Sequence, residues 1–198
     1  SGDDELTSPF DPKYLEDLLL AVNQFPEEKR PIVLLRRAPV DTSGRFEYLK
    51  SRFQNLHTID PAWKSDVSRN NFSASYPSYD DVGLLVNLVR HCDAVFNVGS
   101  TMAHDFAQFN KPAFYVNYDA VPGSRWTTSF IYKFQHFRSM GSLNPVGWIN
   151  KPEDFLMAVK RLIDNEEIEN DRLAWFETIH SVNIETASKN IIELLKDA

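Results

Sequence analysis

Apolar residues near the start of the chain recur with helical spacing and then give way to a short continuous run. Within residues 12–25 they occupy positions i, i+3, i+4 and i+7, which predicts an amphipathic helix. These positions are Leu15, Leu18, Leu19 and Val22. Residues 31–35 then form an uninterrupted apolar run, which is typical of a strand covered on both faces in a parallel sheet.

The remainder of the chain alternates between the same two kinds of pattern. The expected strands lie at 56–59, 94–98 and 113–116. The expected helices lie at 46–53, 78–91, 102–109, near 127–138, at 168–179 and at 184–196. A further helix is expected to begin within 150–154 and to continue through Leu162. Residues 60–77 are polar and are expected to form a surface excursion. Strands that alternate with helices at this spacing pair in parallel, so the sequence predicts a Rossmann-like α/β fold with an open parallel sheet and helices on both faces.

Length and composition fit one domain. A chain of 198 residues is long enough to build one core, and 42% apolar with 25% charged residues excludes a disordered chain or a coiled coil. We therefore expect residues 1–198 to form a single domain, with a flexible lead-in at 1–11 and C-terminal helices at 165–198.

The charge balance narrows the class of partner. Lys and Arg number 21 against 28 Asp and Glu, a net charge of −7, which argues against a protein that binds nucleic acid by neutralising many phosphates.

The single cysteine, Cys92, excludes an intrachain disulfide and a multi-cysteine zinc site. No apolar run is long enough to span a bilayer. We expect a cytoplasmic protein without a transmembrane segment.

The most informative segment is the strand, turn and helix around Gly99. In an open parallel sheet, ligands bind at the carboxyl ends of the strands, where a helix N-terminus offers free N–H groups to an anion. Gly99, Ser100 and Thr101 lie at such a point, and Asp105 follows one turn into the helix. The glycine would let a phosphate approach the backbone, the hydroxyls would donate to it, and the Asp105 carboxylate would accept hydrogen bonds from ribose hydroxyls. This pattern predicts a nucleoside diphosphate site.

A simpler interpretation of the same residues stays open. Gly-Ser-Thr before a helix also serves ordinary N-capping, and an aspartate at position 105 could be a solvated helix residue. The turn is neither the G-x-G-x-x-G dinucleotide fingerprint nor a P-loop, because no second glycine or Gly-Lys-Ser/Thr follows.

Three basic residues are further candidates for the diphosphate. Arg36 and Arg37 end the strand at 31–35, where a guanidinium could bind phosphate in a bidentate manner, although a surface ion pair explains them equally well. His136 follows the strand at 113–116 and could donate to the sugar or distal phosphate, or it could simply pack among aromatics. The histidines lack metal-ligand spacing, so no metal site is expected.

The segment HCDAVFNVGSTMAHD at 91–105, closed by Asn110-Lys111-Pro112, resembles the nucleotide-binding half of GT-B glycosyltransferases. It is also similar to UDP-N-acetylglucosamine 2-epimerases and to the glycerophosphotransferases that build teichoic acids. The resemblance extends more weakly over about 31–163. Two positions depart from it. Arg36-Arg37-Ala38-Pro39 stands where teichoic-type enzymes carry Arg-x-His-Pro, and Asp105 stands where glutamate is more usual.

The resemblance implies the C-terminal, donor-binding half of a GT-B fold that transfers a sugar to a glycan or cell-surface polysaccharide. It assigns the diphosphate to Gly99, Ser100 and Thr101 and the ribose to Asp105. The donor would be a nucleotide sugar, with no cofactor or metal. The catalytic base and the acceptor site would belong to an N-terminal partner domain, so we assign no catalytic residue here and expect little transfer by this chain alone; the full enzyme could associate peripherally with a membrane. A 2-epimerase-like domain and a non-catalytic nucleotide-binding adaptor are the alternatives.

Overall fold

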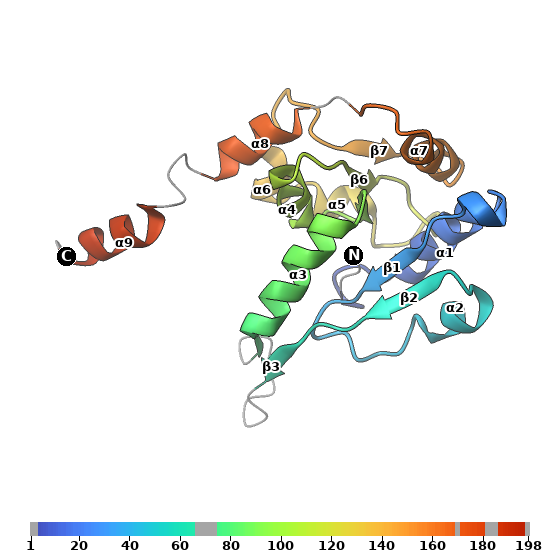
Figure 1. The fold of residues 1–198 in the computed structure, drawn as a ribbon, viewed down its shortest axis with the longest axis horizontal. Coiled ribbons are helices and arrows are strands. Elements are labelled where there is room, and N and C mark those ends of the chain that lie inside the picture. The colour runs from blue at the N-terminus through green and yellow to red at the C-terminus, as the bar shows by residue number, and fades with distance from the viewer. Residues whose placement is uncertain (1–3, 66–74, 169–170, 181–185, 197–198) are drawn as a thin grey trace.

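Helices and strands alternate along the chain, as the sequence predicts (Figure 1). The computed structural model describes residues 4–65, 75–168, 171–180 and 186–196. The helices in these ranges are α1 (Asp11–Val22), η1 (Glu27–Lys29, a 3-10 turn), α2 (Glu47–Arg52), α3 (Tyr79–His91), α4 (Met102–Gln108), α5 (Thr128–Ile131), α6 (Gln135–Arg138), α7 (Asp154–Ile163), α8 (Arg172–Ile179) and α9 (Ala187–Lys196).

The strands confirm the α/β class and its parallel pairing. β1 (Val33–Arg36) pairs in parallel with β2 (Leu56–Ile59). β6 (Ala113–Val116) pairs in parallel with β5 (Val95–Asn97) on one side and with β7 (Gly147–Ile149) on the other. The two groups share no ladder among the described residues, so these strands form two parallel sheets where we expected one.

One expectation about local structure gains detail and another needs correction. Within the interval 60–77, which we expected to be a surface excursion, β3 (Trp63–Ser65) pairs antiparallel with β4 (Ser75–Pro77), while residues 66–74 lie outside the described ranges. The single helix expected near 127–138 is wrong, because two four-residue helices, α5 and α6, occupy that interval. Phe134 separates them with an extended backbone, φ −63° and ψ 147°, which a continuous helix cannot contain.

Helix α1 packs against both sheets. Its Leu18 and Val22 belong to the larger core, which surrounds β5, β6 and β7, whereas Leu19 is fully buried in a smaller core with Leu35 of β1. An apolar stripe with i, i+3, i+4 and i+7 spacing is wide enough to contact two neighbours at once. The amphipathic pattern that predicts α1 therefore also explains how one helix joins the two sheets.

The two ends of the described chain differ in how they pack. Within the lead-in, the carbonyl of Thr7 accepts a hydrogen bond of 2.8 Å from the Trp126 indole. At the other end α9 projects away from the rest of the molecule (Figure 1), and its Leu194 and Leu195 are exposed. Over the described ranges, no helix combines the length and apolarity needed to cross a membrane.

Candidate functional site

The turn that follows β5 is held by its own side chains. Asn97 ends the strand, and its Oδ1 accepts a hydrogen bond of 2.7 Å from the N–H of Ser100. Between them Gly99 adopts φ +61°, in the left-handed region that side chains disfavour. The carbonyl of Ser100 accepts a further hydrogen bond of 2.8 Å from the Tyr115 hydroxyl on β6. The turn is thus fixed at the carboxyl end of the second parallel sheet.

Close packing, as well as backbone conformation, requires a glycine at position 99. A Cβ at this position would lie 2.5 Å from the Ile131 side chain and 3.1 Å from the Phe137 ring. Helices α5 and α6 therefore cover the turn directly on that side. The close approach that glycine permits here is made by protein atoms, which the strand-and-turn pattern alone does not reveal.

Ser100 and Thr101 differ in the use of their hydroxyls. Ser100 Oγ accepts a hydrogen bond of 3.3 Å from the N–H of Met102, so this serine performs the local capping that the simpler interpretation of the turn predicts. Thr101 occupies the N-cap position of α4, is exposed and makes no side-chain cap. Its hydroxyl therefore has no capping role.

Asp105 lies half-buried on α4. Burial raises the pKa of its carboxyl, and the positive field of His180 at the end of α8 opposes the rise. No hydrogen bond to this carboxylate occurs within the part of the chain that the structure describes. Its oxygens are not among the buried atoms that lack a partner, so solvent reaches them, and a ligand with hydroxyl groups could take the place of that solvent.

His104 is a residue that sequence reasoning considered only as a metal ligand and dismissed. It is buried on α4, its ring centroid lies 4.1 Å from that of Trp175 and 5.4 Å from that of His180, and neither ring nitrogen has a hydrogen-bond partner among the described residues. Burial, followed by the charges of His180 and His136, lowers its pKa to about 4. The imidazole is therefore neutral at physiological pH.

This shift predicts acid sensitivity. The pKa of His104 is about 4 in the folded protein against 6.5 as the reference, so folding favours the neutral form. The free energy of unfolding therefore has its full value above pH 6.5 and decreases as the pH falls towards 4, because the unfolded state binds the proton more readily. The total decrease is about 3 kcal/mol. We expect His104→Phe, which keeps a ring against Trp175, to flatten the loss of unfolding free energy between pH 7 and 4.5 in urea titrations. The exposed His57→Phe serves as control, and an unchanged slope in His104→Phe would refute the assignment.

The structure pairs both strand-end arginines with carboxylates. Arg36 Nη2 lies 3.0 and 2.9 Å from the two carboxylate oxygens of Asp81, and Arg37 contacts Asp60 at 2.5 Å. Asp81 is buried, and it also accepts hydrogen bonds from the backbone of Ala62 and the indole of Trp63. Asp81 is thus the centre of a buried polar network at the start of α3, where its own N–H also donates to the capping hydroxyl of Ser78.

His136 lies on the outer side of α6. It is exposed, and its ring centroid is 4.0 Å from that of Phe137, the residue that covers Gly99. The charge of His136 also lowers the pKa of His104, which relates α6 to α4 beside the turn. Arg36, which ends β1 of the other sheet, and Arg37, which follows it, are held there by their ion pairs.

The candidate metal ligands do not assemble. Among the described residues no three His, Cys, Asp or Glu side chains are grouped so that they could hold a metal ion.

Comparison with known proteins does not identify a family for the chain, because no family model, no curated protein and no solved structure matches it. The class that the structure defines is an α/β fold with parallel sheets.

Proposed function

We propose that this domain binds the nucleotide-sugar donor of a GT-B-type glycosyltransferase at the turn after β5. The observation that carries the proposal is the state of Asp105, a half-buried carboxyl whose pKa is raised by burial and which no described group hydrogen-bonds. It lies one turn into the helix that follows a parallel strand, where α/β proteins bind nucleotides. A ribose diol supplies two hydroxyl donors, which match the two oxygens of one carboxylate.

The remaining contacts follow from the turn. The Thr101 hydroxyl, which makes no cap, and the N–H of Gly99 would donate to the diphosphate, whereas the N–H of Ser100 already donates to Asn97 Oδ1. His136, exposed beside Phe137, would donate to the distal phosphate or the sugar. The charges of Arg36 and Arg37 are balanced by Asp81 and Asp60, so we assign neither residue a direct contact with the diphosphate, although Nη1 of Arg36 has no hydrogen-bond partner among the described residues.

Such a site would favour departure of the nucleoside diphosphate. During transfer the bond between the sugar and the diphosphate oxygen breaks, and negative charge grows on that oxygen. Donors fixed in advance around the diphosphate stabilise this charge more than they stabilise the ground state. The proposal places the group that deprotonates the acceptor on a partner domain, as the resemblance of residues 91–105 implies.

Asp105→Asn tests the ribose assignment and has two expected effects. It removes charge-assisted hydrogen bonds to the diol, so affinity for the nucleoside diphosphate should fall by at least about tenfold. It should also stabilise the free protein at pH 7. Burial raises the pKa of Asp105 in the folded state, so the neutral carboxyl favours folding below the unfolded value of 3.8. This stabilisation is lost as the pH rises and the buried carboxyl ionises, and the neutral asparagine avoids that loss.

Both effects are measurable on the same protein samples. Calorimetric titration with UDP, GDP and CDP gives the affinity, and urea unfolding at pH 7 gives the stability. Asp80→Asn, an exposed position on α3, makes the same change of charge and should alter neither quantity. Binding that Asp105→Asn leaves unchanged would exclude the ribose role while keeping the diphosphate site.

A further inference from the structure

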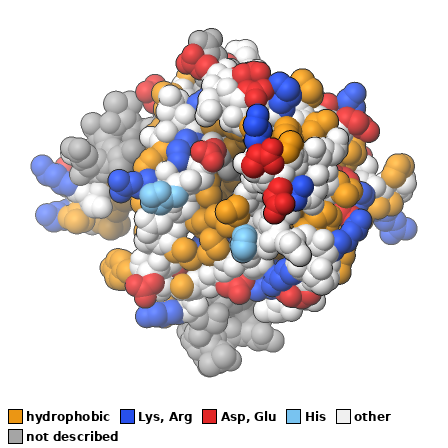
Figure 2. All heavy atoms as spheres, turned by 45° about the vertical axis from the view of Figure 1, so that its right-hand side comes forward, with side chains coloured by type: hydrophobic (Ala, Val, Ile, Leu, Met, Phe, Trp, Pro, Cys, Tyr) orange, Lys and Arg blue, Asp and Glu red, His pale blue; other side chains and the backbone are white. Residues whose placement is uncertain are grey.

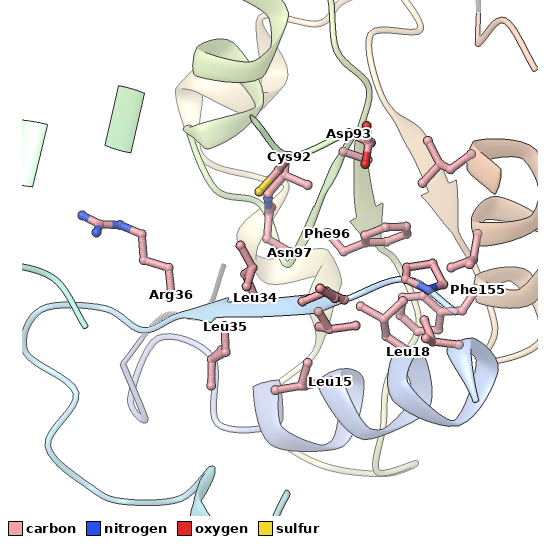
Figure 3. A pocket seen from close by; sticks show the side chains of 18 of the residues that line it. Leu15, Leu18, Leu34, Leu35, Arg36, Cys92, Asp93, Phe96, Asn97 and Phe155 are labelled. Atoms are coloured by element: carbon pink, nitrogen blue, oxygen red, sulfur yellow. The ribbon is translucent and has the colours of Figure 1, made fainter. Parts of the chain in front are cut away.

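An apolar cavity separates the two parallel sheets. Its volume is about 660 Å³, and its walls come from both β1 and β5 (Figure 3). Binding sites for small organic molecules have volumes of roughly 300–1,000 Å³, so the cavity has the size of such a site. Figure 2 shows hydrophobic side chains gathered around a hollow on one face of the molecule.

Aliphatic and aromatic side chains from α1, α7 and both strands form the walls. The principal ones are Leu15, Leu18, Leu34, Val95, Phe155 and Val159. Leu34 remains 37% exposed although it lies within a strand, so the wall that it contributes has no protein cover. The N–H of Val33 donates to the carbonyl of Asn55, so the backbone groups of alternate residues in β1 point towards β2. The N–H and C=O of Leu34 therefore point to the opposite edge of the strand, where the backbone is open. A lipophilic occupant would cover this surface.

Asn97 adds one polar group to the cavity wall. The residue is 5% exposed, and its amide oxygen is already taken by the N–H of Ser100. Its Nδ2 is buried and has no hydrogen-bond partner among the described residues. A buried NH2 group without an acceptor is costly and uncommon in folded proteins. An acceptor atom on a bound molecule would satisfy it.

The charges around the cavity select against an anionic occupant. Asp11 and Asp93 contribute to the lining, and Asp11 is paired with Arg45. Arg36 also contributes, but Asp81 balances its charge and its side chain points away from the cavity (Figure 3); its Nη1 is buried without a hydrogen-bond partner among the described residues. An ionised carboxylate placed among these apolar walls would lose its hydration without a cation to replace it. A neutral acceptor, by contrast, needs only the donor that Asn97 provides.

We propose that this cavity binds a neutral, lipid-like molecule, an aliphatic chain that carries a carbonyl or ether oxygen, with the oxygen accepting from Asn97 Nδ2. The cavity is separate from the proposed nucleotide site in its lining, because Ser100, Thr101 and Asp105 do not line it, but Asn97 contacts both.

The test uses two ten-carbon probes, 2-decanone and decanoate, in calorimetric titrations of the whole chain. The wild-type protein should bind 2-decanone saturably and bind decanoate at least about tenfold more weakly. Asn97→Asp keeps the oxygen that accepts from Ser100 but replaces the donor, so it should weaken binding of 2-decanone about tenfold. Asn190→Asp on the exposed α9 makes the same change of charge and should have no effect.

Two variants that fill the cavity from different helices complete the test. Leu15→Trp on α1 and Val159→Trp on α7 should abolish binding of 2-decanone while circular dichroism and cooperative thermal unfolding show a folded chain. Leu15 is only partly buried, which makes its replacement the safer of the two for folding. Absence of 2-decanone binding to the wild type, equal binding of decanoate, or full binding by a folded filled variant would each overturn the proposal.

Discussion

Replacing Gly99 by alanine should destabilise the protein by about 3 kcal/mol. Two effects add at this position. The backbone has φ +61°, which costs an L side chain roughly 1 kcal/mol, and the new methyl group would lie 2.5 Å from the side chain of Ile131, which forces a shift in a packed region at a cost of roughly 1–3 kcal/mol. Urea unfolding monitored by tryptophan fluorescence measures the loss.

Gly123→Ala separates the two contributions. Gly123 has φ +79° but no heavy atom within 4 Å of an added Cβ, so it reports the backbone cost alone, about 1 kcal/mol. Combining Gly99→Ala with Ile131→Ala should recover part of the loss relative to the sum of the two single variants, because the closest colliding atoms are gone, although the Phe137 ring remains 3.1 Å away. If Gly99→Ala costs no more than Gly123→Ala, the close packing of α5 against the turn is contradicted.

Asp81→Asn should cost about 3–4 kcal/mol. The side chain of Asp81 is 4% exposed and that of Arg36 is 12% exposed, so the substitution leaves a buried guanidinium without its counter-charge. It also weakens the acceptor for the backbone of Ala62 and the indole of Trp63, which hold the segment after β2 against α3. Thermal and urea unfolding should both show the loss.

The neighbouring Asp80 provides the control for this prediction. It is exposed in the first turn of the same helix, so Asp80→Asn changes the helix-dipole interaction but breaks no buried pair. We expect it to change stability by less than about 0.5 kcal/mol. Equal effects at the two positions would show that the ion pair with Arg36 contributes nothing beyond the dipole.

The sequence predicts those elements whose pattern depends on local spacing. The helix with Leu15, Leu18 and Val22 and the strand at 31–35 have strong periodic signals, and both occur close to the expected bounds as α1 and β1. Parallel pairing follows from the alternation of helix and strand, and the structure confirms it for both parallel sheets.

Features that depend on tertiary partners were not predictable in the same way. The division of the parallel strands into two sheets is a relation between β1 and β5, and both strands have the apolar pattern of one continuous sheet. The break at Phe134 lies between two helices that both contact Gly99, through Ile131 and Phe137, and aromatic residues in the sequence do not mark such a break. The burial of Asp81 requires Arg36, which lies 45 residues earlier in the chain.

The candidate site was predictable only in part. Gly99, Ser100, Thr101 and Asp105 are adjacent in sequence, so a local pattern can select them together. The contact of His104 with His180 joins α4 to a helix about 75 residues away, which no spacing rule connects. A polar residue that ends an apolar strand immediately before the turn, as Asn97 does, was a signal available in the sequence and not used.

The most direct test of the central claim, that the turn after β5 binds a nucleoside diphosphate, is a calorimetric titration of the wild-type chain with UDP, GDP and CDP at pH 7 and low ionic strength. We expect saturable binding of at least one of the three with a dissociation constant below about 1 mM, equivalent to roughly 4 kcal/mol or more. Absence of binding heat with all three at millimolar concentration would contradict the claim.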